Sequence, residues 1–420
     1  MDEPQWRRAQ LQLRRGGCGL RCASRLRFAA YWASWADSLA MIRERHPEVA
    51  ARLVQQLEAG NEATAPSAME AAQAAGVVAA SGFEVPSWQA LAEGAPPEAS
   101  DERELGDFVR GWQRAASIPR DAAEEGALTQ DVDNASRALL LSQSGTYASR
   151  HITVLPTVPE FRVPSAQYRV FLLRRLRMVL PLSARRCSCR RFLDPLGDHR
   201  AACARAGLLG PRGMQLERAA GRRCSEAGAR VAWNVFLRDM NLDVPVTDER
   251  RIEVVANGLP IWRGAQLAVD TTLVCPARAD GAPRPQADQV PGLALRDARR
   301  RKRRQTYREL RRARRCRLVV LGFEVGGRWH EESVDFVRRL ARARALQAPA
   351  YLQRATAQSF AHRWSALLAV AAQRAFASSL LELPLQGEVN LDGEAPAQSD
   401  LLADGRWAEE ITPSRMPLRS

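Results

Sequence analysis

The chain has 420 residues, 46% of them hydrophobic, which is typical of a globular protein and excludes disorder along its whole length. Its formal net charge of +15 at pH 7 indicates an anionic partner, with nucleic acid the first expectation. There is no apolar run of about 18 residues and no secretory leader, so we expect neither a membrane span nor secretion. The eight cysteines then favour metal ligation or free thiols over disulfides.

The first third of the chain changes character near residue 58. Residues 24 to 58 carry aromatic and aliphatic side chains at helical spacing, which predicts a helix. Residues 59 to 135 are acidic and rich in Ala, Pro and Gly, which predicts a mobile connector. A basic, apolar helix is expected from about residue 166 to residue 180, ending at Pro181.

A short segment after this helix carries three cysteines and one histidine. Tetrahedral zinc is commonly held by three thiolates and one imidazole. An Asp-Pro-Leu-Gly turn between the two ligand pairs would bring them together. We therefore predict a structural Zn²⁺ site whose ligands are Cys187, Cys189, His199 and Cys203. The single residue between the first two cysteines is a tight spacing, and a reduced, metal-free loop is the alternative.

Helical and strand-like segments alternate from residue 207 onward, which predicts an α/β fold. The expected elements are a helix at 215–230, strands at 251–255 and 266–274, a helix from 295, a strand at 316–325, a helix at 332–345 and a long helix at 349–381.

Lys302 is the only lysine, and the other 61 of the 62 basic residues are arginine. It lies on the apolar stripe of its expected helix, with Leu295, Ala298, Thr306 and Leu310, while the arginines point elsewhere. Because lysine can lose its proton and arginine cannot, this placement fits a role at a phosphate or a metal-bound water. The alternative is a lysine whose head group extends into solvent.

Two acidic residues lie in neighbouring expected strands. Asp270 interrupts an apolar strand, where a buried carboxylate is costly unless it is paired or metal-bound. Glu253 lies in the strand before it. Carboxylates that hold Mg²⁺ or Mn²⁺, with a lysine that orients water, are the parts of a metal-dependent DNA-cleaving site. The alternative is a salt bridge from Asp270 to one of the many arginines, or from Glu253 to Arg250 or Arg251.

This order of elements resembles the PD-(D/E)xK restriction-like nuclease core. With the Cys/His segment directly before it, the region resembles the restriction-like endonuclease of LINE-type (non-LTR) retrotransposons. The resemblance implies a restriction-endonuclease-like αββαβα core at residues 207 to 345, with Glu253, Asp270, Lys302 and Tyr307 as catalytic residues. It implies Mg²⁺ or Mn²⁺ as the catalytic ion, bound by the two acidic residues. The implied activity is nicking of target DNA for target-primed reverse transcription.

The chain departs from that family pattern at three places. Glu253 stands where an aspartate is expected, and no proline precedes it. Thr271 and Thr272 follow Asp270 where the common pattern has its lysine, and Lys302 fits the branch that places this lysine on the next helix. One more residue separates the lysine from the tyrosine than the family leads us to expect.

The resemblance also implies a domain order and partners. The segment Arg14-Arg-Gly-Gly-Cys-Gly-Leu-Arg21 and the helix after it are similar to the end of a reverse transcriptase thumb. The expected regions are a thumb remnant at 1–58, the connector at 59–135, the basic helix and zinc knuckle at 136–206, the nuclease core at 207–345, a C-terminal helix at 346–386 and an acidic disordered tail at 387–420. Implied partners are double-stranded DNA, element RNA and the reverse transcriptase domain of a longer polyprotein. The implied location is the nucleus or a cytoplasmic ribonucleoprotein.

Arginine runs near Lys302 are expected to contact the nucleic acid backbone. They comprise Arg299, Arg300, Arg301, Arg303, Arg304, Arg311 and Arg312. A solvated helix face is the alternative for any single run.

Two other interpretations of the chain stay open. One is a catalytically inactive, zinc-knuckle nucleic-acid-binding remnant, favoured by the departures at Glu253 and Thr271 but not by the retained lysine. The other is a basic structural protein, which explains neither the knuckle nor the lysine. Glu217, before the first strand, is either a supporting acid or a solvated helix residue, and Glu324 could line the cleft or cap a turn.

Overall fold

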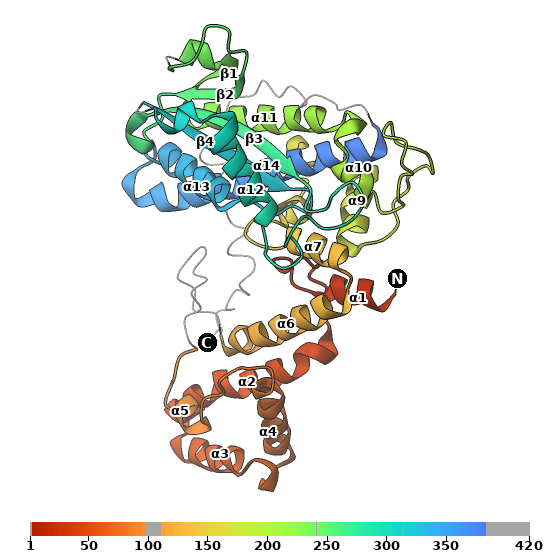
Figure 1. Ribbon diagram of the computed structural model, residues 1–420. Coiled ribbons are helices and arrows are strands. Elements are labelled where there is room, and N and C mark those ends of the chain that lie inside the picture. The colour runs from red at the N-terminus through yellow and green to blue at the C-terminus, as the bar shows by residue number, and fades with distance from the viewer. Residues whose placement is uncertain (1, 98–110, 241, 314, 384–420) are drawn as a thin grey trace. The chain divides into compact units, whose positions relative to one another are not determined.

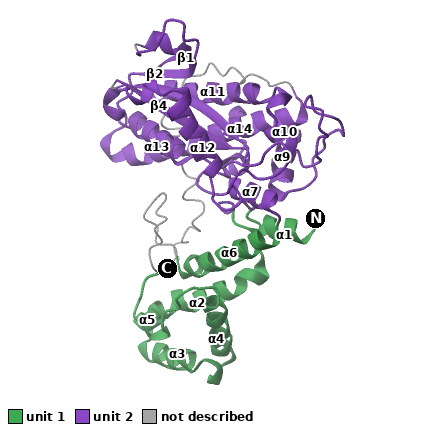
Figure 2. Ribbon diagram, in the orientation of Figure 1, with its two compact units in different colours: residues 1–12, 18–132 green, residues 13–17, 133–420 purple. Residues whose placement is uncertain are grey.

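The computed structural model describes residues 2–97, 111–240, 242–313 and 315–383. The chain divides into two compact units (Figure 2). Unit 1 comprises residues 1–12 and 18–132, and unit 2 comprises residues 13–17 and 133–420. Charge divides between them. Unit 1 has 12 basic and 19 acidic residues, for a net charge of −7, whereas unit 2 has 50 and 28, for +22.

Unit 1 is helical in its described part (Figure 1). Its helices are α1 (Glu3–Gln10), α2 (Ala23–Arg45), α3 (Pro47–Ala59), α4 (Pro66–Ala79), α5 (Trp88–Ala92) and α6 (Trp112–Asp131). Helix α2 packs against α3, α4, α5 and α6. At the centre of this core the buried Trp32 ring makes edge-on contacts with Phe83 and Trp112.

The structure differs here from the expectation of a mobile connector at residues 59–135. Helices α4, α5 and α6 lie within that range, and Ala71 and Ala74 of α4 are buried in the core. Alanine is the strongest helix former and allows close helix contacts, while Pro66 sits in the first turn, where proline is tolerated. The helix expected at 24–58 is divided by Pro47, which begins α3. Residues 98–110 of the expected connector and the expected tail at 387–420 lie outside the described residues.

Unit 2 contains one mixed four-stranded sheet, so its fold is α/β as predicted. Its strands are β1 (Arg230–Phe236), β2 (Arg251–Asn257), β3 (Gln266–Val274) and β4 (Cys316–Glu324), in the order β1-β2-β3-β4. Neighbours β1 and β2, and likewise β2 and β3, are antiparallel, whereas β3 and β4 are parallel and joined by a crossover through α12 (Leu293–Arg301). Strand β1 was not predicted, because this edge strand is mostly exposed and lacks the alternation of a half-buried strand.

Helices cover both faces of this sheet. The further helices of unit 2 are α7 (Asn134–Ser142), α8 (Arg150–Thr153), α9 (Ser165–Leu176), α10 (Asp198–Ala202), α11 (Leu209–Glu226), α13 (Glu331–Ala345) and α14 (Gln353–Leu381). On one face α11, α13 and α14 enclose a core with Val269, Phe336 and Trp364. On the other face Tyr307 and Leu310 cover the sheet after α12. Helix α9 ends four residues before the predicted end, at Leu176, because Arg177 adopts a left-handed conformation.

The segment Ala350–Leu381 is long and apolar enough to cross a membrane by length and composition. However, 83% of its apolar window is buried inside the protein, as in the core helix of a folded unit.

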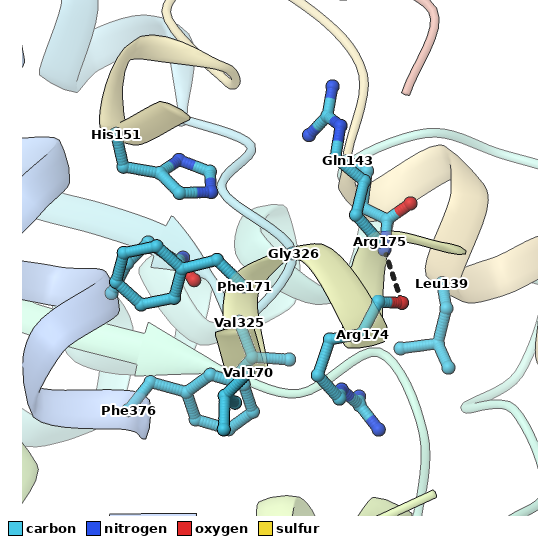
Figure 3. A pocket seen from close by; sticks show the side chains of 11 residues that line it. Leu139, Gln143, His151, Val170, Phe171, Arg174, Arg175, Val325, Gly326 and Phe376 are labelled. Atoms are coloured by element: carbon cyan, nitrogen blue, oxygen red, sulfur yellow. Dashed lines mark hydrogen bonds between the residues drawn. The ribbon is translucent and has the colours of Figure 1, made fainter. Parts of the chain in front are cut away.

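A small cavity lies among α7, α8, α9, α14 and the turn after β4 (Figure 3). Its volume is about 10 Å³, close to that of one water position. Among the described residues, Gln143 Oε1, His151 Nδ1 and Gln373 Nε2 have no hydrogen-bond partner there. Burial, aided by the Arg175 charge, lowers the pKa of His151 to about 3, so this imidazole is neutral at pH 7. No predicted site residue lines the cavity.

Candidate active site and metal centre

Asp270 and Glu253 lie next to each other on the central strands. The register pairs Val254 of β2 with Val269 of β3, and one step further along this ladder Glu253 is opposite Asp270. Directly opposed residues of antiparallel strands project from the same face. Asp270 is fully buried, and Glu253 Oε2 accepts a hydrogen bond from the Thr271 amide at 2.5 Å. The structure therefore brings together the two carboxylates that the sequence singled out.

The Lys302 head group lies on Asp270. Its Nζ is 2.8 Å from Oδ1 and 2.8 Å from Oδ2, while the lysine side chain is 22% exposed. Asp270 therefore pairs with the single lysine rather than with an arginine. Asp270 Oδ2 accepts no hydrogen bond from the described residues, because only the Oδ1 contact has hydrogen-bond geometry.

A π-helical segment explains how Lys302 and Tyr307 reach the same carboxylate. The helix predicted to continue past residue 310 ends as α-helix at Arg301, and Lys302–Thr306 form a π-helix. The Tyr307 amide donates to the Lys302 carbonyl at 2.8 Å, a contact between residues five apart. Since a π-turn holds one residue more than an α-turn, it accommodates the additional residue between lysine and tyrosine.

The Tyr307 hydroxyl connects Asp270 to strand β2. It lies 2.9 Å from Asp270 Oδ1 and 3.1 Å from the Arg251 carbonyl oxygen, and donates its one proton to either. Burial, followed by the charge of Asp270, raises the pKa of Tyr307 far above its usual range. The phenol therefore stays protonated and acts as a donor.

Three acidic side chains influence one another at this site. Burial, then the charges of Asp270 and Glu217, raises the pKa of Glu253 to about 8. Burial also raises the pKa of Asp270 against the opposing effect of Lys302, and burial plus Asp270 raises that of Glu217 on α11. Each negative charge at this site makes ionisation of the neighbouring carboxyl groups less favourable, and a bound cation would remove this penalty. The sequence left Glu217 undecided, and the structure places it, on α11, where the charge of Asp270 raises its pKa.

The three carboxylates have the right ligand atoms for a divalent cation, but they are not already arranged around a single point. The carboxylates and the unbonded Asp270 Oδ2 are the oxygen ligands that Mg²⁺ and Mn²⁺ prefer. Within the described residues, however, the cysteine–histidine set alone brings three or more ligand atoms within 4.8 Å of one another. Glu217, Glu253 and Asp270 would have to approach one another around an ion.

Arg250 does not pair with Glu253, which removes one alternative that the sequence left open. Its guanidinium instead forms salt bridges with Asp248 at 2.5 Å and Glu309 at 3.1 Å, and it donates to the Thr306 carbonyl. These contacts attach the beginning of β2 to the segment after the π-helix. Arg250 thus supports the site from outside it.

The predicted nucleic-acid-binding arginines fall into two groups. Arg299 and Arg303 both form salt bridges with Glu332 of α13, so they hold α12 and the π-helix against that helix. The other five are exposed, namely Arg300, Arg301, Arg304, Arg311 and Arg312. The structure thus leaves the second group with accessible guanidinium groups near Lys302.

The four predicted zinc ligands converge. Their ligand atoms all lie within 4.8 Å of one another, with Cys189 Sγ 3.2 Å from His199 Nε2 and Cys187 Sγ 3.9 Å from Cys203 Sγ. The tight spacing of the first pair is achieved in a turn that the Arg190 amide closes on the Cys187 carbonyl, at 2.7 Å. This Cys₃His cluster could bind a metal such as zinc.

The protonation of the cluster suits a metal. His199 Nδ1 lies 2.7 Å from the Ala279 carbonyl oxygen, which places the ring proton on Nδ1 and leaves Nε2 a free lone pair toward the cysteines. Burial raises the pKa of Cys187, but hydrogen bonds, first that from the Cys189 amide, lower it to about 6 overall, whereas burial raises the pKa of Cys203. A thiolate is the form that binds zinc.

Residues that the sequence did not single out hold this cluster in place. The Asp194 carboxylate accepts hydrogen bonds from the amides of Leu196, Asp198 and His199, and so caps α10. Asp198 forms buried salt bridges with Arg174 and Arg177, both at 2.6 Å. The N-cap position of α10 is Gly197, so the sequence carries no ordinary N-cap signal that would have identified Asp194.

No protein-family model matches the chain, and a search of curated proteins found no match.

Proposed function

We propose that unit 2 is a metal-dependent DNA endonuclease with a restriction-like core, encoded by a LINE-type retrotransposon, that nicks target DNA for target-primed reverse transcription. The observation that carries the proposal is the convergence of Glu253, Asp270, Lys302 and Tyr307 from two strands and the segment after α12. An acidic pair that can hold a divalent cation, beside a lysine that can contact a phosphate, is one arrangement suited to metal-dependent hydrolysis of a phosphodiester.

Each residue has a role that follows from its surroundings. Asp270 and Glu253 would hold Mg²⁺ or Mn²⁺, which when bound supplies charge neutralisation and a polarised water. Tyr307 keeps the Asp270 carboxylate oriented, because its hydroxyl lies between Asp270 and the β2 backbone. Lys302 is partly exposed, so its ammonium can move from Asp270 to a phosphate oxygen when DNA and an ion are bound.

The remaining features support binding of double-stranded DNA, and of element RNA. Unit 2 carries the positive charge of the chain, and five exposed arginines lie near Lys302 on the chain. Contacts to phosphates contribute affinity without reading sequence. The Cys₃His cluster, with Zn²⁺ bound, would form a rigid knuckle within the same positively charged unit. A nuclear location, or a ribonucleoprotein with a reverse transcriptase domain, goes with this function.

The test is nicking of supercoiled plasmid by the full chain in Mg²⁺ or Mn²⁺. Asp270→Asn and Lys302→Met should each reduce nicking at least about a hundredfold, a loss of the size seen when charge-stabilising groups are removed. Asp297→Asn is the matched control, since Asp297 lies on α12 and is 60% exposed. Nicking that survives Asp270→Asn would exclude this site.

A catalytically inactive nucleic-acid-binding remnant is the second candidate, and one observation favours it. Lys302 forms an ion pair with Asp270, so the charge of this buried carboxylate is balanced without a metal ion. In that case the full chain would bind DNA in a salt-sensitive manner and nick none of it with either ion.

A further inference from the structure

The loop between β3 and α12, residues 275–292, joins the strand of Asp270 to the helix that directly precedes Lys302. Its base is fixed: Cys275 and Ala277 are buried, and Arg284 Nε donates to the Cys275 carbonyl at 2.8 Å. Its tip is a small hairpin in which the Arg278 amide donates to the Ala282 carbonyl at 2.8 Å. We call this segment the β3–α12 loop.

The tip of the β3–α12 loop contacts the Cys₃His cluster through a single hydrogen bond. His199 Nδ1 donates to the Ala279 carbonyl oxygen at 2.7 Å, across 80 positions of sequence. The side chain of Asp280 bonds within the tip, to the Ala282 amide. In the described residues 278–282, the hydrogen bond from His199 is the one that reaches another element.

We infer that metal binding at the Cys₃His cluster anchors the β3–α12 loop through His199. A metal on Nε2 leaves Nδ1 as the one protonated ring nitrogen and fixes the plane of the ring, so the N–H is directed at Ala279. Without a metal the imidazole can exchange tautomers and rotate, and either change removes the donor. His199 is thus a ligand and, through Ala279, a positioning residue for the loop.

This anchoring connects the metal cluster to the proposed active site along the chain. The β3–α12 loop ends at Gly292, which precedes α12, and α12 ends at Arg301, directly before Lys302. Loss of the metal should therefore loosen the tip first, while the buried base and the strands stay ordered. The inference rests on metal binding by the cluster and does not require the nuclease to be active.

Hydrogen exchange measured by mass spectrometry on the full chain tests it. Loading with Zn²⁺ should slow exchange in peptides covering residues 276–285 about fivefold to tenfold relative to chelated protein, the effect of one hydrogen bond. Peptides from unit 1 serve as the internal reference. Bound zinc is measured in parallel.

The variant His199→Cys tests the hydrogen bond to Ala279 independently of metal binding. Four thiolates bind zinc well, so this variant should hold one zinc, yet it has no ring N–H for Ala279. Its zinc-loaded loop should exchange as fast as the chelated wild type. Cys203→Ser, which retains His199 but weakens metal binding, should exchange fast as well. His46→Cys in unit 1 is the control and should leave the loop protected.

Two results would overturn the inference. One is a wild-type chain with bound zinc whose loop exchanges no more slowly than the chelated protein. The other is a zinc-loaded His199→Cys variant whose loop is as protected as the wild type. A chain that binds no zinc would overturn it together with the proposed zinc knuckle, and the nicking assay would be unaffected as a test of the nuclease.

Discussion

The Nζ atom of Lys302 lies 2.8 Å from each oxygen of Asp270, a carboxylate with no solvent exposure. The chain thus directs its one lysine to its most buried acidic residue in the central sheet. Because the π-helix turns Tyr307 to the same carboxylate, three groups from two elements form a single hydrogen-bonded unit. The unit can be tested through its stability before any activity is measured.

Lys302→Met should lower the free energy of unfolding by about 1–3 kcal/mol, since it leaves a buried carboxylate without its charged partner. Asp270→Asn should cost less on a Lys302→Met background than alone, because the two residues act as a pair. Denaturant unfolding of the two single variants and the double variant measures this coupling. If the losses of unfolding free energy in the two single variants add up to the loss in the double variant, the interaction between Lys302 and Asp270 does not contribute to stability. Arg300→Met is the control for removing a positive charge from α12.

Tyr307→Phe should reduce stability by about 1 kcal/mol, because it deletes one hydroxyl shared by Asp270 and the Arg251 carbonyl. Its nicking activity should fall less than that of Lys302→Met, since the phenol orients the carboxylate and the lysine reaches the substrate. Tyr351→Phe is the matched control, as Tyr351 is 83% exposed. A Tyr307→Phe variant as inactive as Lys302→Met would instead assign the hydroxyl a direct role.

Glu253 should make metal-free protein less stable as the pH rises. Its pKa is about 8 in the folded state, raised by burial and then by Asp270 and Glu217, against an ordinary value of 4.5. The folded state therefore holds the proton more tightly than the unfolded state. This contribution to stability is complete below about pH 4.5 and is lost as the pH rises through about 8.

Glu253→Gln should flatten the fall in stability between about pH 5 and pH 8, because an amide does not titrate there. Chemical denaturation across this range, without added Mg²⁺, measures the slope. Glu331→Gln, at an exposed position on α13, should leave the slope unchanged. Equal slopes in the wild type and Glu253→Gln would contradict the raised pKa.

Local chemistry was readable from the sequence. The composition of residues 187–203 predicted the Cys₃His cluster, and a carboxylate inside an apolar strand drew attention to Asp270. The lone lysine on an apolar stripe left a chemical role and a solvent-extended head group as alternatives, and the structure places its ammonium on Asp270. In each case a residue type conflicted with its neighbours, which is a signal that a single sequence contains.

Contacts between distant segments were not readable. Strand β1 is an exposed edge strand, so hydrophobic periodicity did not reveal it. The π-helix at Lys302–Thr306 could not be predicted either, because a search for the α-helical period does not distinguish it from an α-helix. The anchor from His199 to the Ala279 carbonyl uses a backbone atom, which any residue could supply. The pairing of Arg303 with Glu332 likewise depended on where α13 packs.

Removing one thiolate should remove the metal. Cys189→Ser should lower bound zinc from about one per chain to near zero at micromolar free zinc, because three remaining ligands bind far more weakly. It should also lower the unfolding temperature of unit 2, since metal binding stabilises the folded form. Metal content and thermal unfolding are the measurements. Cys22→Ser in unit 1 should change neither, and a Cys189→Ser chain with full zinc content would exclude this ligand set.

The two groups of arginines should differ in how they affect DNA binding. Replacing the exposed Arg300, Arg304 and Arg312 together with Gln should weaken binding and reduce the slope of log affinity against log salt by up to about 0.9 for each phosphate that the variant no longer neutralises. Arg303→Gln should leave that slope unchanged, because Arg303 bonds Glu332 and the Leu318 carbonyl. It should instead lower stability by about 1 kcal/mol.

Fluorescence anisotropy with a labelled duplex at several salt concentrations measures both variants. The comparison is matched, because all four arginines lie between residues 300 and 312 and each substitution removes one positive charge. If Arg303→Gln reduces the salt slope as much per residue as the triple variant, then the salt bridge to Glu332 opens in the complex and all the arginines contact phosphate. If neither variant changes the slope, then the duplex binds elsewhere on the positively charged unit 2 and the surface around Lys302 is not its site.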